Sequence, residues 1–305
     1  MIRNEELVQI LIPCFNGQEY LEETLVSIQN QTHGCFDCLM IDDGSCDESS
    51  RIFNNFAQRD SRFRLIANEK NQGESYSVNK GWSNSKAKLI CILSCDDPQP
   101  SDWLENMIKF RSQNPGFIVY YPNRLVIDKE GVTTRREVLF DWERSLLTDD
   151  LLCIVSVGAM IDTSFVPNDF EPRIQEVVFP SDLIQYLKLS EFGDGIRHPS
   201  YFSNWREHGR SKSAEEKKIL AKEFAEGMHV YLKKNSDKDI QIQESAIYAN
   251  LVRMLQKDFS IFPAIVLAYK IYLREFEFRS LSMAELFKIF ARFRQRRITR
   301  QIKGL

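Results

Sequence analysis

Short apolar runs alternate with helix-forming segments along the first part of the chain, and this alternation constrains the fold more than any other feature. Four runs have the length and composition of buried strands: Val8–Ile12, Phe36–Ile41, Arg64–Ala67 and Leu89–Leu93. The segments between them place apolar residues at helical spacing. Strands that alternate with helices of about 10–15 residues are typical of βαβ units around a parallel sheet. The pattern therefore predicts an α/β fold.

Polar clusters follow three of the predicted strands: Pro13–Asn16, Asp42–Ser45 and Ser94–Asp97. In sheets of this kind, ligands bind outside the carboxyl ends of the strands. The expected topology and the chemistry of the residues thus point to the same edge of the sheet.

The adjacent carboxylates Asp96 and Asp97 need an explanation, because such a pair in a crevice is costly unless cations neutralise it. Mg²⁺ or Mn²⁺ would satisfy both side chains and bridge to a diphosphate. Alternatively, the two acids only cap the helix that follows Pro98. Asp42 and Asp43 stand at the parallel position, where an Asp either accepts a hydrogen bond from a base or ribose, or caps a helix.

The chain beyond residue 116 has a less regular pattern. Phe117–Tyr121 and Leu125–Ile127 are expected to form a pair of strands, and Pro180–Asp182 is expected to open a helix. After about residue 214 the pattern is helical to the end. We expect one domain over 1–213, with halves of about 1–115 and 116–213, followed by a helical region over 214–305.

Charge is distributed unevenly, although the net charge is only −3. Residues 1–200 hold 19 basic and 31 acidic side chains, whereas residues 201–305 hold 21 basic and 12 acidic ones. Residues 279–305 hold eight basic side chains and one acid, Glu285, among apolar residues at roughly helical spacing. Such a helix can lie on an anionic membrane surface. Alternatives are a helix packed on the domain with a solvated basic face, or a nucleic-acid site, which is disfavoured because stacking motifs are missing.

Composition excludes several classes of protein. A chain with 43% hydrophobic and 27% charged residues is not intrinsically disordered. No run of about 18 apolar residues predicts a transmembrane helix, and the N-terminus lacks a signal-peptide pattern, so we expect a cytosolic protein. The seven cysteines lack framework spacing, which fits reduced thiols. Cys35 and Cys38 lack the second pair that a zinc site needs, so Cys38 is predicted to be a core residue.

In their order and spacing, the motifs resemble those of the family-2 inverting glycosyltransferases. The similar segments include VQILIPCFN at 8–16, MIDDGS at 40–45, NQGES at 71–75 and LSCDD at 93–97. The resemblance is dense over about residues 6–110 and sparser to about 213. It implies the Rossmann-like GT-A fold, a mixed and mainly parallel sheet flanked by helices, here with a helical C-terminal extension.

The resemblance also assigns roles to individual residues. It implies that a nucleotide-sugar is bound by Pro13, Cys14, Asp43, Asn71 and Asp96, with Asp43 as the partner of the base, commonly uracil. It implies that Mg²⁺ or Mn²⁺ is bound by Asp96 and Asp97.

Three positions depart from the family pattern. Ser94 replaces the first acid of an Asp-x-Asp-Asp motif, and Ser181 replaces the Glu of a Glu-Asp segment. Val78 stands where many members have Arg, so a diphosphate contact would come from elsewhere, such as Lys80.

The same resemblance places Asp182 at the position of the catalytic base, which takes the proton of the acceptor hydroxyl. The alternative for Asp182 is an acid favoured by the dipole at a helix N-terminus. A later segment with Arg206, His208 and Arg210 also resembles the family. There His208 would complete the metal shell or contact the diphosphate, unless it is structural, and either Arg would bind phosphate.

The sequence therefore predicts a metal-dependent inverting glycosyltransferase, of the hexosyl type, that uses a UDP-sugar in surface polysaccharide biosynthesis. Its acceptor would be a glycan or lipid-linked hydroxyl, at the cytoplasmic membrane face through 279–305, and no nucleic-acid partner is expected. One alternative is a catalytically silent binding subunit of a membrane glycan assembly, which the three departures favour. Another is a nucleotidyltransferase, which would normally have a Gly-rich phosphate loop after its first strand.

Overall fold

The structure, a computed structural model, describes residues 6–155, 157–209, 217–235, 242, 244–256, 264 and 268. The chain divides into two compact units, 1–144 with 153–214 and 145–152 with 215–305. Residues 145–152 thus group with the second unit, although they lie inside the segment 116–213 expected to belong to the first. The expected membrane segment 279–305 and Arg210 lie outside the described residues.

The first unit is built on an eight-stranded sheet in which the four predicted strands are present and parallel. They are β1 (Val8–Cys14), β2 (Phe36–Asp42), β3 (Phe63–Ala67) and β4 (Leu89–Ile92), side by side in the order β3-β2-β1-β4. The sheet continues through β7 (Met160–Asp162), which is antiparallel to both β4 and β5 (Val119–Ile127). β5 also pairs with β6 (Thr133–Glu137), antiparallel, and with β8 (Gly195–Arg206), parallel.

The prediction of two strands over Phe117–Tyr121 and Leu125–Ile127 is wrong, because one strand, β5, crosses both segments. The polar residues between them interrupt the apolar pattern without ending the strand. The register between β5 and β8 shifts on both sides of Asn123, and the Asn123 amide donates to the Pro199 carbonyl at 2.6 Å. An irregular strand of this kind has no clear period-two signal in the sequence.

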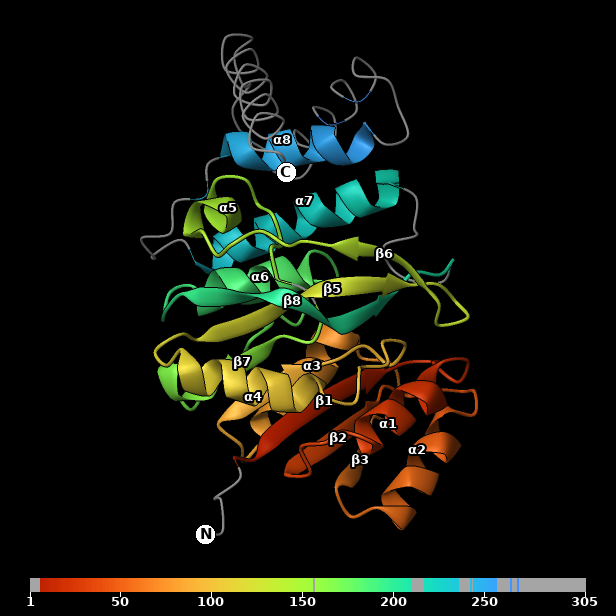
Figure 1. Cartoon of the computed structure of the whole chain (residues 1–305). Coiled ribbons are helices and arrows are strands. Elements are labelled where there is room, and N and C mark those ends of the chain that lie inside the picture. The colour runs from red at the N-terminus through yellow and green to blue at the C-terminus, as the bar shows by residue number, and fades with distance from the viewer. Residues whose placement is uncertain are drawn as a thin grey trace. The chain divides into compact units, whose positions relative to one another are not determined.

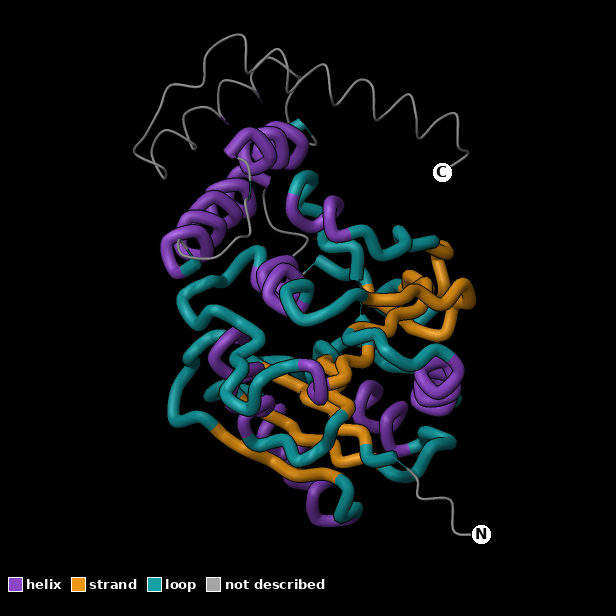
Figure 2. Tube along the Cα trace, turned by 90° about the vertical axis from the view of Figure 1, so that its left-hand side faces the viewer, coloured by secondary structure: helices purple, strands orange, loops and turns teal. Residues whose placement is uncertain are grey.

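Helices cover both faces of the parallel part of the sheet (Figures 1 and 2). One face, with Val8, Ile10 and Ile12 of β1, packs against α1 (Leu21–Gln29), α2 (Ser49–Arg59) and α4 (Trp103–Gln113). The other face packs against α3 (Glu74–Ser83), where Gly81 allows a close approach, since a Cβ there would lie 3.0 Å from Ile41 Cδ1. A short 3₁₀ helix (Thr163–Phe165) and α6 (Ser181–Leu189) complete the unit.

The described part of the second unit is helical, as predicted. It contains α7 (Lys217–Lys234) and α8 (Glu244–Leu255), which pack on each other, and most of the short helix α5 (Arg144–Thr148). The Asn250 amide donates to the Asp150 carbonyl at 2.6 Å, which attaches residues 145–152 to α8. No helix in the described part of the chain is long and apolar enough to cross a membrane. The mixed, mainly parallel sheet with flanking helices and a helical C-terminal region confirms the predicted fold class.

Two neighbouring residues of α1 offer a test of this packing. The Leu25 side chain is 0% exposed and Val26 is 41% exposed. We expect Leu25→Ala to reduce the free energy of unfolding by about 2–5 kcal/mol, because it leaves a cavity under the sheet. Val26→Ala should change it by less than about 0.5 kcal/mol. Denaturant titration of both variants would measure the difference, and equal losses would contradict the packing described here.

Candidate active site

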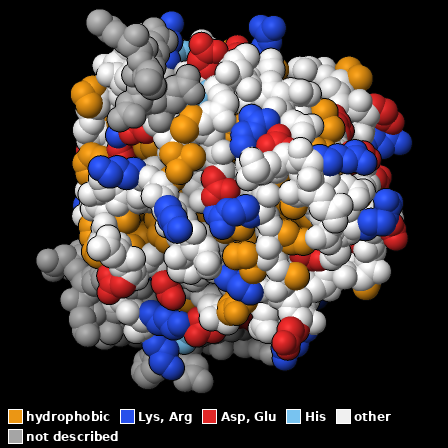
Figure 3. Space-filling view, turned by 90° about the horizontal axis from the view of Figure 1, so that it is seen from below, with side chains coloured by type: hydrophobic (Ala, Val, Ile, Leu, Met, Phe, Trp, Pro, Cys, Tyr) orange, Lys and Arg blue, Asp and Glu red, His pale blue; other side chains and the backbone are white. Residues whose placement is uncertain are grey.

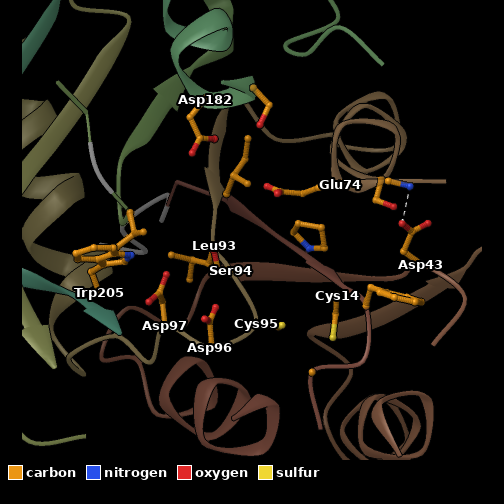
Figure 4. Close-up of a pocket in the computed structure, with 18 of the residues that line it drawn as sticks. Cys14, Asp43, Glu74, Leu93, Ser94, Cys95, Asp96, Asp97, Asp182 and Trp205 are labelled. Carbon is orange, nitrogen blue, oxygen red and sulfur yellow. Dashed lines mark hydrogen bonds between the residues drawn. The ribbon is translucent and has the colours of Figure 1, made fainter. Parts of the chain in front are cut away.

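A cavity of about 690 Å³ lies at the carboxyl ends of β1, β2 and β4 (Figure 4). Its wall also includes the start of α3, Cys153, Val155 and Val157, several residues of 173–186 and the end of β8. The cavity brings together all eight residues predicted to form the site: Pro13, Cys14, Asp43, Asn71, Asp96, Asp97, Asp182 and His208. These residues come from segments far apart in the sequence, so their convergence is a property of the fold.

Asp43 anchors the loop in front of α3. Its buried carboxylate accepts hydrogen bonds from the backbone N–H groups of Gln72 at 2.9 Å and Gly73 at 2.8 Å, and from the Asn68 amide at 2.7 Å. It does not cap the helix that follows β2, because the Ser49 N–H at the start of α2 is bound by Asp47. The alternative of helix capping is therefore wrong for Asp43.

Gly44 allows the turn after β2 to contact this loop. Its φ is +74°, in the region that favours glycine, and a Cβ there would lie 2.6 Å from the Lys70 carbonyl carbon. Because that neighbour is backbone, no side-chain rotation would relieve the clash. Gly44 and Asp43 together fix where Asn71 stands at the cavity.

Asp96 and His208 are in contact at the end of the cavity opposite Asp43. His208 Nε2 lies 2.7 Å from Asp96 Oδ2, and both side chains are largely shielded from solvent. The His208 ring also contacts the Tyr20 ring, with 4.8 Å between centroids. The prediction that His208 belongs near Asp96 thus has a geometric basis, although its role stays a prediction.

Asp97 is more deeply buried than Asp96. Its Oδ1 accepts a hydrogen bond from the Arg206 backbone N–H at 2.7 Å. Burial and the neighbouring charge of Asp96 raise the pKa of Asp97 well above its ordinary value. The protein therefore holds this carboxyl in a place where its ionised form is costly.

Arg206 is a structural clamp, and the prediction that its side chain binds phosphate is wrong. The guanidinium is fully buried and donates to the carbonyls of Asp96, Asp128 and Lys129 at 2.9–3.0 Å. It also pairs with Glu23 of α1 at 2.6 Å and lies over the Tyr20 ring. With these contacts made, no donor of Arg206 is directed into the cavity.

Lys80, expected as a substitute for the missing Arg at position 78, does not line the cavity either. Its ammonium donates to the Asn68 Oδ1 at 2.7 Å and so supports the residue that binds Asp43. Val78 itself is fully buried. In this chain, position 78 therefore faces the core rather than a ligand.

Asp182, at the first turn of α6, lies across the cavity from Asp96 and Asp97 (Figure 4). Its side chain is 63% exposed and forms an ion pair with Arg173. The same guanidinium binds Glu74 Oε1 at 2.9 Å. An exposed carboxylate on the far side of the cavity is accessible to a second substrate.

Sequence reasoning missed four residues that shape the cavity: Arg124, Arg173, Glu74 and Trp205. Arg124 pairs with Glu137 at 2.6 Å and stacks on the Trp205 ring, 4.1 Å from its centroid. Trp205 directly precedes Arg206 on a strand, so the two side chains point to opposite sides. The position of Trp205 next to the Arg206 motif is a signal that could have identified it. Arg173 gave no signal; one of its partners, Glu74, lies 99 residues away along the chain.

The cavity has an excess of acidic side chains. Six line it, namely Glu19, Asp43, Glu74, Asp96, Asp97 and Asp182, against Arg124, Arg173 and His208. Both arginines are already paired with acids. A diphosphate would therefore need a further cation to bind here.

The donor set fits a Mg²⁺ or Mn²⁺ ion that shares its coordination with a substrate. Among the described residues, no group of three or more His, Cys, Asp or Glu side chains is arranged to hold a metal ion by itself. Mg²⁺ usually binds one or two carboxylates together with water and substrate phosphates. Asp96, with Asp97 and His208 beside it, meets that requirement.

Sequence comparison identifies the family. The profile of glycosyl transferase family 2 matches residues 9–166, so the chain belongs to this family. An uncharacterized glycosyltransferase of Haemophilus influenzae is 32% identical over 140 residues, which is 44% of this chain and 56% of that protein. The putative teichuronic acid biosynthesis glycosyltransferase TuaG of Bacillus subtilis is 28% identical over 189 residues, 61% of this chain and 73% of TuaG.

Structural comparison gives the same fold. The chain is similar to S. aureus TarS 1–349, with a TM-score of 0.64 and 15% identity, over 88% of this chain and 80% of TarS. TarS has also been solved with UDP and with UDP-GlcNAc. The mannosyltransferase PcManGT of Pyrobaculum calidifontis, in complex with GDP-Man and Mn²⁺, has a TM-score of 0.57 and 14% identity, over 94% of this chain and 79% of PcManGT. The predictions of the family and of the GT-A fold are confirmed.

Two further observations concern other parts of the molecule. The seven cysteines all lie in the described part of the chain and form no disulfide, and Cys38 is a fully buried core residue as predicted. On the face seen in Figure 3, Lys and Arg side chains are interspersed with Asp and Glu.

The burial of the Asp97 carboxyl predicts that one substitution will stabilise the metal-free protein and weaken ligand binding. We expect Asp97→Asn to raise the Tm of the metal-free protein at neutral pH, because the amide keeps an acceptor for the Arg206 N–H and removes a buried charge. The variant should lose Mn²⁺-dependent nucleotide binding. Thermal unfolding and calorimetry would measure the two effects.

The sign of the pH dependence follows from the raised pKa of Asp97 in the folded state. Below the pKa of the unfolded chain, both states are protonated and the variant gains nothing. As pH rises from there to the folded-state pKa, the unfolded chain ionises first, so the native protein loses stability that the variant keeps. The Tm difference should therefore be near zero at about pH 3.5 and grow towards neutral pH; a gain largest in acid would contradict it.

Proposed function

We propose that the chain transfers a sugar from a UDP-linked donor to a hydroxyl group of a glycan or lipid-linked acceptor, with inversion at the anomeric carbon. One observation carries this proposal. The Asp96–Asp97 pair and Asp182 face each other across a single cavity, with Asp43 along its side (Figure 4). An inverting displacement needs this separation, since the nucleophile and the leaving group occupy opposite faces of the sugar.

In the proposed reaction, the Asp182 carboxylate accepts the proton of the acceptor hydroxyl while that oxygen attacks the anomeric carbon. The bond from the anomeric carbon to the diphosphate oxygen breaks, and its electron pair leaves with the nucleoside diphosphate. A Mg²⁺ or Mn²⁺ ion held by Asp96, Asp97 and His208 would supply positive charge to that diphosphate. The single displacement inverts the anomeric centre.

The donor assignment rests on the nucleotide half of the cavity. Pro13 and Cys14 would border the base and Asn71 would contact the nucleotide, on a wall that Asp43 holds in place. TarS binds UDP and UDP-GlcNAc, and PcManGT binds GDP-Man with Mn²⁺, on a similar fold. These neighbours support a nucleotide-sugar donor, and the Asp43 motif favours uracil.

The acceptor assignment rests on relatives and on charge. TuaG is named for teichuronic acid biosynthesis, which supports a surface polysaccharide as the product. The basic residues of 279–305 would attach the protein to an anionic membrane surface that carries a lipid-linked acceptor. The protein would then act in the cytoplasm, at the membrane face.

A thermal-shift screen tests the donor and the metal together. We expect UDP and UDP-sugars to raise the Tm with Mn²⁺ and to lose this effect when EDTA is added, because the acidic cavity needs a cation to hold a diphosphate. At about 100 times Kd, a ligand stabilises the native state by about 2.7 kcal/mol. Larger shifts with GDP-sugars would contradict the uracil assignment, and equal shifts in EDTA would contradict metal dependence.

Asp182→Asn tests the base. The variant should lower kcat about 10²–10⁴-fold while the Kd for UDP with Mn²⁺ stays nearly unchanged, because the amide cannot accept the proton but removes no nucleotide contact. Release of UDP and binding of UDP would be measured on the same preparation. Full retained activity would remove Asp182 from the reaction. UDP-sugar binding without turnover by the unmodified protein would support the silent binding subunit instead.

A further inference from the structure

Arg173 is a buried cation between two walls of the cavity. Its side chain is only 4% exposed, and its guanidinium contacts two carboxylates, those of Asp182 and Glu74. It also donates to Ser181 Oγ at 2.8 Å and Gln185 Oε1 at 3.1 Å. A buried arginine whose partners lie on both α3 and α6 has a fixed orientation.

The backbone around Arg173 is attached to α3. The Asn79 side chain accepts from the Arg173 N–H at 3.0 Å and donates to the Arg173 carbonyl at 2.9 Å. One turn earlier on the same helix, Ser75 Oγ donates to the Val177 carbonyl at 2.8 Å. Because α3 starts beside Gly73, which Asp43 binds, one rigid helix connects the nucleotide wall to Arg173.

We propose that Arg173 is a positioning residue for sugar transfer, which holds the Asp182 carboxylate towards the acceptor side of the cavity. This inference rests on the proposed function, in which Asp182 is the base. Arg173 binds Oδ1 of Asp182, and its own position is fixed by Glu74, Ser181 and Gln185. An exposed side chain without such a partner would sample several rotamers, so the ion pair limits where the base can stand.

The arrangement also accounts for Ser181, which replaces an acid of the family pattern. The Ser181 hydroxyl accepts a hydrogen bond from Arg173 without adding charge. A glutamate there would place a third carboxylate on a single buried guanidinium and weaken its hold on Asp182. Serine therefore suits a chain in which Arg173 serves the base.

The test separates kcat from donor binding. Release of UDP from UDP-GlcNAc or UDP-glucose, with water as acceptor, would be followed at saturating Mn²⁺ and donor, and the Kd for UDP with Mn²⁺ would be measured on the same preparation. Arg173→Met should lower kcat by about 100-fold, because a misplaced reacting group can cost that much, while the Kd stays nearly unchanged. Arg173→Lys keeps a cation but not the planar fork that binds Asp182 and Ser181 together, so it should recover only part of kcat.

Glu74→Gln is the matched control, because it removes the charge of another partner of the same guanidinium and leaves the Arg173–Asp182 ion pair in place. It should lower kcat much less than Arg173→Met does. A purely structural role for Arg173 predicts a lower Tm in its variants with kcat per folded protein unchanged. An unchanged kcat in Arg173→Met, or an equal loss of kcat in Glu74→Gln, would overturn the proposal.

Asp182→Asn separates failure of this inference from failure of the proposed function. Turnover by Asp182→Asn, or no UDP release from any UDP-sugar by the unmodified protein, removes the base and with it the role of Arg173. An inactive Asp182→Asn beside an unchanged kcat in the Arg173 variants removes only the role of Arg173. If Arg173→Met does not fold, Arg173→Lys still decides, because a lower kcat at an unchanged Kd supports the proposal and an unchanged kcat contradicts it.

Discussion

The buried guanidinium of Arg206 is the interaction on which the geometry of the candidate site depends. It connects the turn after β4, the loop after β5 and helix α1, while its own backbone N–H binds Asp97. Burying an arginine is costly unless its donors are satisfied, and here three carbonyl oxygens and Glu23 accept four hydrogen bonds from the guanidinium. The Asp96–Asp97 turn is therefore held by a polar network rather than by apolar packing.

A second constraint is the electrostatic state of the cavity. Its acidic side chains outnumber its cations, and Asp97 is held where burial raises its pKa. Such an arrangement lowers the stability of the protein, and a cation bound beside Asp97 would relieve it. Functional sites commonly lower the stability of the folded state in this way.

The sequence predicted the parallel part of the sheet well, because its strands are short, mainly apolar runs and polar clusters follow three of them. It also placed the residues predicted to bind the donor or the metal, or to act as the base, at the same cavity. It did not predict β5, whose polar interruption at Asn123 removes the period of two. It did not predict Arg173 either, because the contact with Glu74 arises only when distant segments meet. The prediction that Arg206 binds phosphate was wrong because a sequence motif gives the residue type but not the direction in which its side chain points.

The end of β8 has a consequence for how proteins of this kind can change. Asn204 binds the Pro98 carbonyl, Trp205 faces the cavity, Arg206 clamps the Asp96 carbonyl, and His208 reaches Asp96. Successive residues of a strand point to opposite sides. One inserted or deleted residue here would therefore turn Trp205 away from the cavity and Arg206 towards it. Point substitution can remodel the wall at position 205 while the length of this segment stays fixed. In evolutionary terms, this strand end admits new side chains but not insertions or deletions, and diversity in chain length has to arise in other loops.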